Sequence, residues 1–385
     1  MALDYYIHSE GKRLRCGYTT GTCAALAASG AATLLLTGSV PPFMGIRTPK
    51  GIWVECEMLD LQRNTDCASA AVAKDAGDDC DVTDGLRIYA TVAKAPEPGI
   101  LIQGGEGVGT VTKPGLDQPV GAAAINSVPR TMITQAVERV CREAGYTGGL
   151  TVAISIPGGA KAAEKTFNPH MGIVGGLSIL GTSGIVEPMS REALTDTIAL
   201  ELGQARALGH HRVILTPGNY GLDFLTAQGW DALGVPVVRC SNFIGFAIDE
   251  AGIQGFSHVL LVGHAGKLVK LAGGIFNTHS RTADCRMELL CAHAALSGAG
   301  ADLCRQVMDC VTCDAAHDLL AQAGLWDAVA DSLTQAICRQ ITHRAGAQVT
   351  AGAVFFSNRS GLWGMTQEAQ EMIAQWTSKQ ASSTP

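Results

Sequence analysis

Charged side chains are scarce in this sequence. Asp, Glu, Lys and Arg make up 16% of the 385 residues, and the formal net charge is −7. Proteins that bind nucleic acid generally carry an excess of Lys and Arg for the phosphates, so this charge argues against that class of partner. The composition, with 47% hydrophobic residues and 46 glycines, is typical of an α/β or α+β enzyme. The length favours two domains.

A long apolar run is also missing. Residues 23–36 form a run of fourteen residues that contains Ser29, Gly30 and Thr33. This length fits a buried core helix better than a membrane span, which needs about 20 residues. The N-terminal residues lack the apolar core of a signal peptide. We therefore expect a cytoplasmic protein with no membrane partner.

Cysteine, by contrast, is frequent, with 13 residues. The odd count and the length of the chain favour reduced thiols that pack as small hydrophobic side chains. Cys310 and Cys313 form an isolated CxxC pair, and His317 is the one further candidate ligand close to it in the sequence. A structural zinc site needs four ligands. We therefore expect structural thiols here and no metal bound by the protein.

The first half of the chain mixes helices and strands without a strict order. Residues 17–46 contain no charged side chain and open with Thr19, Thr20 and Thr22. Any of the three can cap a helix that runs over residues 24–36 and ends at Gly38. Residues 52–58, 86–92 and 150–156 alternate like strands, residues 100–112 indicate two strands around a glycine turn, and residues 129–143 indicate a helix. We expect an α+β domain over residues 1–185.

The second half has a different pattern. After a helix over residues 190–208, the apolar runs 212–216, 235–239 and 258–263 are each followed by a turn and a helical segment. Continuous apolar runs that alternate with helices are typical of a parallel, doubly wound sheet. Helices dominate residues 284–344, and residues 349–357 indicate a further strand. We expect an α/β domain over residues 186–377 and a flexible tail over residues 378–385.

Two glycine-containing motifs fail the tests for nucleotide-binding sites. Gly105, Gly107 and Gly109 follow a strand, but extended residues stand where a dinucleotide-binding fingerprint needs a helix. We expect a tight loop with an exposed backbone there. Gly266-Lys267 is no P-loop, because Leu261 and Leu268 occupy the positions of the earlier glycine and the following Ser or Thr.

Two strand-end loops remain as candidates for a cofactor site. Their residues are Pro217, Gly218, Asn219 and Tyr220 after one predicted parallel strand, and Gly263, His264 and Gly266 after another. Ligands of open α/β sheets bind at the carboxyl edge of the strands. The alternative is that both loops are ordinary turns, in which glycine and asparagine are common.

Candidate anion-binding residues lie in three further places. The helix start with Thr19, Thr20, Gly21 and Thr22 could combine free backbone N–H groups with hydroxyl donors, although plain capping explains it equally well. Lys161 and Lys165 lie beside a glycine-rich turn, with a solvated loop as the alternative. Arg281 lies in a polar loop and could bind a carboxylate, while Asp284 could cap the next helix.

Longer stretches resemble a known family. GYTTGTCAALAA at residues 17–28 is similar to the opening signature of the CbiD family, the cobalt-precorrin-5B C1-methyltransferases of the anaerobic cobalamin pathway. Residues 75–85, 107–116, 124–133, 165–190, 217–221, 242–251 and 263–284 also fit, in the expected order. Cys80 and Ser183 are small departures, where proline and threonine are expected.

The resemblance implies a two-layer α+β N-terminal domain and a Rossmann-like three-layer α/β/α C-terminal domain. It also implies methyl transfer from S-adenosylmethionine to C1 of a tetrapyrrole that brings its own cobalt. This substrate is a flat apolar ring with acetate and propionate arms. The candidate carboxylate receptors are then Thr19, Thr20, Gly21, Thr22, Lys161, Lys165 and Arg281. We assign the methyl donor to the two strand-end loops.

The sequence does not single out a catalytic residue. In-line methyl transfer to a nucleophilic ring carbon can rely on positioning and electrostatics. The candidates for moving a proton are Asp249, Glu250, His264 and Asp284. A non-catalytic tetrapyrrole carrier is the alternative function, and binding of the methyl donor separates the two; the missing fingerprint disfavours a nucleotide-dependent reductase. Besides the tetrapyrrole, we expect a homo-oligomer and transient contact with neighbouring pathway enzymes.

Overall fold

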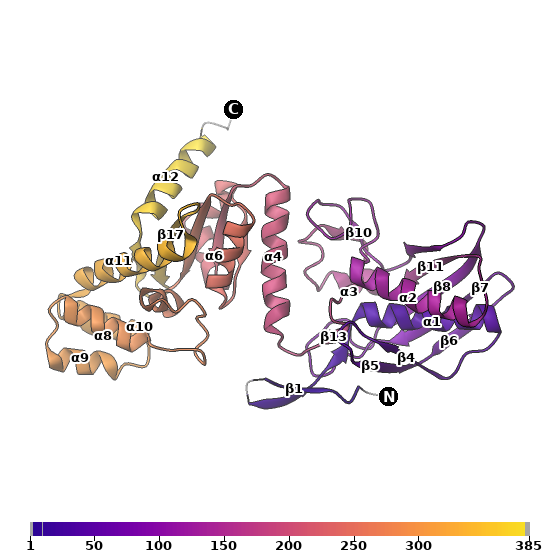
Figure 1. The fold of residues 1–385 in the computed structure, drawn as a ribbon. Coiled ribbons are helices and arrows are strands. Elements are labelled where there is room, and N and C mark those ends of the chain that lie inside the picture. Colours follow the sequence, from indigo (N-terminus) through magenta and orange to yellow (C-terminus); the bar gives the residue numbers. More distant parts are fainter. Residues whose placement is uncertain (1–2, 10, 382–385) are drawn as a thin grey trace. The chain divides into compact units, whose positions relative to one another are not determined.

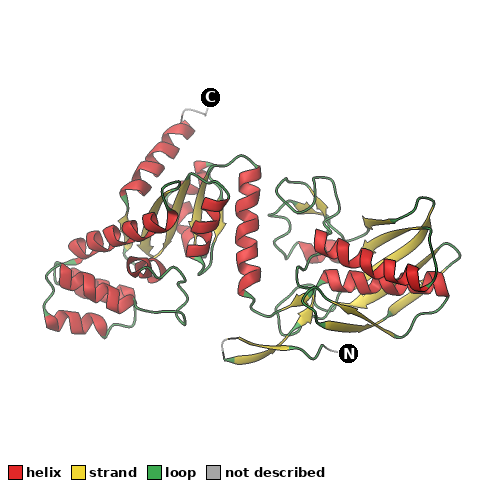
Figure 2. Cartoon of the chain, viewed as in Figure 1, coloured by secondary structure: helices red, strands yellow, loops and turns green. Residues whose placement is uncertain are grey.

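The chain divides into two compact units. The computed structural model describes residues 3–9 and 11–381; unit 1 is Met1–Ser190 and unit 2 is Arg191–Pro385. Each unit has a five-stranded sheet, so the chain is a mixed α/β protein with two main sheets, as expected (Figures 1 and 2). A boundary between residues 185 and 186 would cut β13 (Ile185–Val186), which pairs with β3 (Gly17–Tyr18) inside unit 1.

The main sheet of unit 1 is mixed, in the order β6-β7-β8-β11-β9. Its strands are β6 (Leu59–Arg63), β7 (Cys67–Ala73), β8 (Arg87–Ala95), β9 (Ile100–Gly104) and β11 (Gly149–Ser155). β11 runs parallel to β9 and antiparallel to β8. Further antiparallel pairs are β1 (Tyr6–Ser9) with β2 (Lys12–Arg15), β4 (Phe43–Arg47) with β5 (Trp53–Glu57), and β10 (Thr110–Val111) with β12 (Ile173–Val174).

Two long helices pack together in unit 1. α1 (Thr20–Thr37) packs on β7 and β8 and lies beside α2 (Ser127–Glu143), as Figure 1 shows; the short α3 (Gly159–Ala163) follows β11. Thr19 caps α1, because its Oγ1 accepts the N–H of Thr22 at 3.2 Å, and Gly38 ends the helix at a φ of 88°. α1 is long and apolar enough to cross a membrane, but 83% of its apolar window is buried inside the protein. It is therefore a core helix.

The main sheet of unit 2 is mostly parallel, in the order β15-β14-β16-β17-β18. Its strands are β14 (Arg212–Thr216), β15 (Val237–Arg239), β16 (His258–His264), β17 (Thr350–Ser357) and β18 (Gly361–Met365), of which β18 alone runs antiparallel to its neighbour. The helices are α4 (Arg191–Ala207), α5 (Asn219–Ala227), α6 (Ile244–Ile253), α7 (Ala265–Leu268), α8 (Arg286–Leu296), α9 (Ala301–Met308), α10 (Cys313–Gln322), α11 (Trp326–Ala345) and α12 (Gln367–Ala381). Two 3₁₀ turns are η1 (Trp230–Leu233) and η2 (Val269–Gly273).

Helices cover both faces of the unit 2 sheet. Ile214 and Leu260 belong to a core with residues of α5 and α12, whereas Val213 and Leu261 belong to a core with residues of α4, α6 and α11. Because successive strand residues point to opposite faces and both faces are buried, the strands are continuous apolar runs. This is the pattern from which the parallel sheet was predicted.

The structure differs from the sequence expectations at the C-terminus and at one loop. Residues 378–381 continue α12 and do not begin a flexible tail, while residues 382–385 lie outside the described residues. The backbone of residues 107–109 is buried, and the loop is tied to other segments: the N–H of Gly105 donates to the Ile154 carbonyl, and the Gly107 carbonyl accepts the N–H of Leu177. These partners are distant in the sequence, so the local glycine pattern could not reveal them.

Candidate functional site

The two predicted cofactor loops meet at the carboxyl edge of the unit 2 sheet. β14 and β16 are neighbours; the chain continues from β14 to β15 on one side and from β16 to β17 on the other. Such a divergence opens a crevice at which parallel sheets bind ligands. Pro217, Gly218, Asn219 and Tyr220 follow β14, while Gly263 and His264 end β16 and Gly266 follows them.

Direct contacts join the two loops. Lys267 Nζ donates to the Pro217 carbonyl at 2.8 Å, and the ring centroids of Tyr220 and His264 lie 5.7 Å apart. Tyr220 is 60% exposed, and Asn219 is exposed as well. A Cβ atom added to Gly218 would meet nothing within 4 Å, so a ligand can approach the backbone there. This edge therefore offers an aromatic ring, an amide side chain and open backbone.

His264 is held in one tautomer by its own loop. Its Nδ1 accepts the N–H of Gly266 at 3.1 Å and thereby caps α7. The neutral ring consequently carries its proton on Nε2. Burial lowers the pKa of His264 below the ordinary value, which favours the neutral ring at pH 7.

A cavity of about 410 Å³ includes Gly266 in its wall. Its lining is almost entirely polar and consists of Asn242, Gly266, Lys267, Lys270, Thr278, His279, Ser280 and Arg286. Three of these side chains are cationic, and the wall contains no carboxylate. The cavity is therefore suited to an anionic group.

Lys270 is a buried residue that lines the 410 Å³ cavity. Its side chain is 2% exposed, and Nζ donates to the carbonyls of Thr278 at 3.0 Å and Ala283 at 2.8 Å. Nζ also lies 3.9 Å from Oδ1 of Asp284. Burial lowers the pKa of Lys270. The lysine therefore holds residues 278–283 in place at the edge of the cavity.

The carboxylates considered as proton carriers are engaged in pairs. Asp284 binds Arg286 at 2.5 and 2.9 Å, and this contact lowers the pKa of the Asp284 carboxyl. Asp249 binds Arg344 at 2.9 and 2.5 Å. Glu250 accepts the side-chain amide of Gln254 at 2.5 Å. None of these three carboxylates lines the 410 Å³ cavity.

The threonines at the start of α1 are committed to contacts inside unit 1. Thr20 Oγ1 accepts the N–H of Leu180 at 3.0 Å, and Thr22 Oγ1 donates to the Gly184 carbonyl at 2.7 Å. The N–H of Gly21 donates to the Leu180 carbonyl at 3.1 Å. The helix start therefore holds residues 178–184 against itself.

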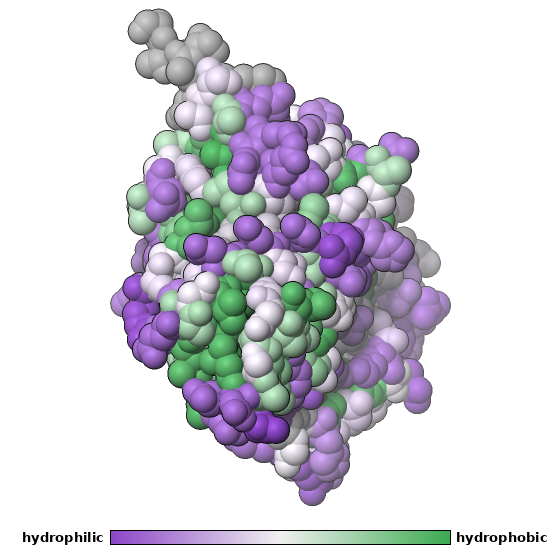
Figure 3. All heavy atoms as spheres, turned by 90° about the vertical axis from the view of Figure 1, so that its left-hand side faces the viewer, coloured by the Kyte–Doolittle hydropathy of each residue, from purple (hydrophilic) through white to green (hydrophobic). Residues whose placement is uncertain are grey.

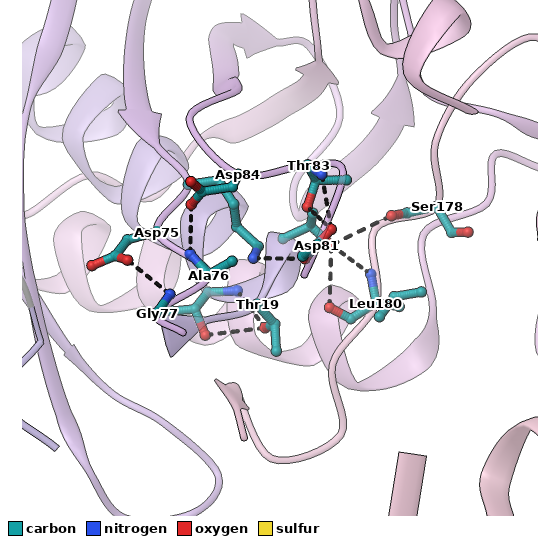
Figure 4. A network of polar contacts seen from close by, with 12 residues as sticks. Thr19, Asp75, Ala76, Gly77, Asp81, Thr83, Asp84, Ser178 and Leu180 are labelled. Atoms are coloured by element: carbon teal, nitrogen blue, oxygen red, sulfur yellow. Dashed lines mark hydrogen bonds and ion pairs between the residues drawn. The ribbon is translucent and has the colours of Figure 1, made fainter. Parts of the chain in front are cut away.

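A second cavity, of about 170 Å³, lies beside this helix start. It is lined by Thr19, Thr20, Lys74, Asp81, Thr83, Thr166, Asn168, Leu177, Ser178, Leu180 and Val186. Figure 4 shows Thr19, Asp81, Thr83, Ser178 and Leu180 from several segments around one centre. Of the predicted substrate residues, Thr19 and Thr20 reach this cavity, and Gly21 and Thr22 are buried next to them.

An ion pair forms one wall of the second cavity. Lys74 Nζ lies 3.0 Å from Oδ2 of Asp81, and the Lys74 side chain is 1% exposed. Oδ1 of Asp81 accepts the N–H and the hydroxyl of Thr83, at 2.8 and 2.7 Å. Burial alone would raise the pKa of the Asp81 carboxyl, but Lys74 and Thr83 outweigh it and lower the pKa.

The remaining predicted residues do not line either cavity, although Lys165 precedes the lining residue Thr166 and Arg281 follows the lining residue Ser280. Lys161 and Lys165 are exposed in and after α3, and Arg281 is exposed in the loop before α8. Cys313 is buried, and Cys310 Sγ donates to the Gln306 carbonyl at 3.3 Å. Within residues 3–9 and 11–381, no group of three or more His, Cys, Asp or Glu is placed to hold a metal ion.

Comparison with known proteins identifies the relatives of this chain. A sequence profile of the CbiD family matches residues 7–188, and a profile of the CbiD C-terminal domain matches residues 277–367. A cobalt-precorrin-5B C(1)-methyltransferase of Ruminiclostridium cellulolyticum is 45% identical over 379 residues, which cover 98% of this chain and 96% of the relative. The chain belongs to the CbiD family.

Two further relatives differ in how similar they are to this chain. The protein of the same name from Alkaliphilus metalliredigens is 43% identical and covers 96% of this chain and 97% of its own length. A crystal structure of a cobalamin biosynthesis protein (cbiD) from Archaeoglobus fulgidus is 29% identical, covers 72% of this chain and 86% of that chain, and has a TM-score of 0.38.

Several residues of these sites were not singled out from the sequence of this CbiD-family chain. They are Lys74, Asp81, Asn168 and Ser178 in unit 1, and Asn242, Lys270, Thr278, Ser280 and Arg286 in unit 2. One signal was available for Lys270, which stands in the apolar run Leu268-Val269-Lys270-Leu271. A lysine within such a run is a candidate for a buried cation.

Proposed function

We propose that this chain is a cobalt-precorrin-5B C(1)-methyltransferase of cobalamin biosynthesis. The observation that carries the proposal is the relationship along almost the whole chain. Relatives of that name are 41–45% identical over 96–98% of it. We place the activity in the cytoplasm, and S-adenosylmethionine is the methyl donor of the proposed reaction.

We assign the methyl donor to the edge where β14 and β16 diverge, in a Rossmann-like unit 2. The residues there fit the donor, because Gly218 leaves open space beside its Cα atom and Tyr220 presents an exposed ring. An adenine can stack on such a ring, and Asn219 can bind a polar group of the donor. His264 contributes a donor at Nε2, because its Nδ1 is occupied by Gly266.

The cations of the adjacent cavity serve a different group. Lys267, Lys270 and Arg286 outnumber the one carboxylate, Asp284, that pairs with Arg286 from outside the lining. The wall is therefore net positive, and it repels a sulfonium and attracts a carboxylate. We therefore assign this wall to a carboxylate of a reactant. The positively charged end of the donor has to lie away from the wall.

Methyl transfer requires little from the side chains beyond positioning the two reactants. S-adenosylmethionine, when bound, supplies an electrophilic methyl group to the nucleophilic ring carbon. The rigid loops position the reactants, and holding two reactants in line can remove about 7–11 kcal/mol of a barrier. The neutral His264 and the paired Asp249 and Asp284 are not poised as strong bases, so we expect positioning to dominate.

Calorimetric titration with S-adenosylhomocysteine tests the assignment, with NADPH as a control ligand. We expect saturable binding of S-adenosylhomocysteine near one per chain and no binding of NADPH. Asn219→Ala should weaken binding about fivefold to tenfold, the effect of one lost hydrogen bond, without lowering the melting temperature. Gln322→Ala, which removes an exposed amide on α10 of the same unit, serves as the matched control and should bind like the parent.

The outcomes separate the alternatives. Unchanged affinity in Asn219→Ala would remove this loop from the donor site. Absence of binding, also with the tetrapyrrole present, would favour the carrier function instead.

A further inference from the structure

The ammonium group of Lys74 has more N–H donors than the described part of the chain provides acceptors for. A lysine ammonium carries three N–H donors, and among the described residues Asp81 is the one acceptor that Lys74 Nζ meets, at 3.0 Å. The side chain is 1% exposed. Burying a charged donor without partners is costly. Lys74 lines the 170 Å³ cavity, so this space is where further acceptors have to come from.

The orientation of the Asp81 carboxylate is fixed by its hydrogen bonds. One of its oxygens is held by the N–H and hydroxyl of Thr83, and the other by Lys74. The surrounding acidic loop is pinned as well: Asp84 accepts the N–H of Ala76 at 2.8 Å, and Asp75 accepts the N–H of Gly77 at 2.9 Å (Figure 4). The Lys74–Asp81 pair therefore forms one wall of the 170 Å³ cavity, and its geometry is set before any ligand binds.

The other donors near the cavity are already used. Thr22 Oγ1 donates to the Gly184 carbonyl, so Thr19 Oγ1 is the donor in its 3.3 Å contact with Thr22 Oγ1. Thr20 Oγ1 faces the carbonyls of Ser178 at 3.4 Å and Leu180 at 3.3 Å, and the N–H of Gly21 donates to the Leu180 carbonyl. Hence Lys74, rather than the start of α1, is the group available to an incoming anion. The threonines shape the wall.

The size of the cavity limits what can enter. About 170 Å³ corresponds to roughly five or six water molecules at ~30 Å³ each. A tetrapyrrole ring does not fit, whereas one short carboxylic acid arm does. Leu177, Leu180 and Val186 supply apolar contacts for the methylene groups of such an arm.

We propose that the cavity beside Lys74 receives one carboxylate arm, an acetate or propionate, of the tetrapyrrole substrate. The carboxylate would accept hydrogen bonds from Lys74 Nζ and from the side chain of Ser178, which lies in the same wall. Ser178 Oγ now donates to Asn168 Oδ1 at 3.0 Å and can exchange this partner. The identity of the ligand rests on the proposed function, but the carboxylate site itself does not.

A titration with propionate tests the site directly. The full chain, labelled with ¹⁵N at lysine Nζ, is titrated with propionate and, separately, with its neutral isostere propionamide. We expect propionate alone to shift the Lys74 signal saturably, with a dissociation constant in the millimolar range for so small a ligand. Lys94→Met, which removes an exposed lysine of β8 in the same unit, should leave this binding unchanged.

Two variants distinguish binding from a purely structural ion pair. Lys74→Met should abolish propionate binding. Asp81→Asn should tighten it about threefold or more, because a carboxylate that repels the ligand is removed. The single amide oxygen can accept from Lys74 or from Thr83 but not from both, so Lys74 loses competition for its donors as well. A structural pair predicts no such gain. If propionate leaves the Lys74 signal unmoved, or if Asp81→Asn binds no more tightly, the proposal is overturned.

Turnover then separates this proposal from the proposed function. With cobalt-precorrin-5B as methyl acceptor, Lys74→Met should raise KM at least about tenfold and leave the affinity for S-adenosylhomocysteine unchanged. Unchanged KM in a folded Lys74→Met variant would refute the arm site alone. Propionate binding by a parent protein that transfers no methyl group would refute the proposed function and leave the carboxylate site in place.

Discussion

At the residue scale, Gly181 shows how tightly the loop over α1 is packed. Its φ is +134°, and a Cβ atom would lie 2.3 Å from Thr19 Oγ1. Gly181→Ala should therefore suffer both a strained backbone, about 1–3 kcal/mol, and overpacking, about 1–3 kcal/mol. Chemical denaturation measures the free energy of unfolding of the variant.

Gly51→Ala is the matched control, because Gly51 also has a positive φ, +82°, but nothing lies within 4 Å of its Cβ position. Gly51→Ala should lose the backbone contribution alone. Equal losses in the two variants would show that the contact between Gly181 and Thr19 is looser than described.

At the element scale, one hydroxyl decides how α1 begins. Thr19 Oγ1 caps the helix by accepting the N–H of Thr22. Thr19→Ala should lower the free energy of unfolding by about 1 kcal/mol, the usual contribution of such a cap. Thr19→Ser keeps the oxygen and should retain most of the stability. Comparable losses in Ala and Ser variants, measured by denaturation, would indicate that packing of the Thr19 methyl group matters more than capping.

The elements with a clear period could be predicted from the sequence. β5, β8 and β11 alternate, and β14, β16 and β17 are continuous apolar runs, so each pattern follows from which faces are buried. β7 was missed, because its sequence CASAAVA consists of small residues that give little contrast between faces. α12 was not predicted, and its last residues were assigned to a flexible tail, because the sequence there is mostly polar.

The positions of the two strand-end loops could be predicted from the sequence, because they follow from sheet topology. The buried lysines of the two cavities could not, because their burial depends on tertiary packing. The loops with Asn219 and His264 follow parallel strands, so a general rule of strand ends locates them. Lys74 looks like a surface lysine when read locally, and for Lys270 the apolar residues around it are the one local signal of burial. Only packing between distant segments, such as Thr278 against Lys270, turns them into buried cations.

At the scale of the whole molecule, unit 1 should be sensitive to acid. Arg15 lowers the pKa of the Asp75 carboxyl, and Lys74 and Thr83 overcome burial to lower that of Asp81. Folded-state pKa values below the ordinary value of about 3.9 mean that both carboxylates stabilise the fold fully above that pH. This stability is lost as the pH falls through the lower folded-state values.

Hydrogen–deuterium exchange of β7 and β8 between pH 6 and acidic pH measures this effect within unit 1. Asp81→Asn should lose protection already at pH 6 and depend less on acid. Asp66→Asn, at an exposed position of the same unit, should behave like the parent. An acid response that Asp81→Asn leaves unaltered would assign the sensitivity to other groups.

The surface of unit 2 also bears on the expected assembly. Leu296, Met308 and Val311 are 78%, 43% and 82% exposed, at the ends of α8 and α9 and in the turn before α10. Figure 3 shows the side of unit 2 that carries these helices, with hydrophobic surface among hydrophilic residues. A homo-oligomer and contacts with neighbouring enzymes remain predictions.

The central claim is that this chain transfers a methyl group from S-adenosylmethionine to C1 of cobalt-precorrin-5B. The most direct measurement is anaerobic incubation of the full chain with cobalt-precorrin-5B and S-adenosylmethionine that carries a trideuteriomethyl group, followed by mass spectrometry and NMR of the product. The account predicts the gain of one labelled methyl group, located at C1. A tetrapyrrole recovered unmethylated, or methylated at another carbon, would contradict it.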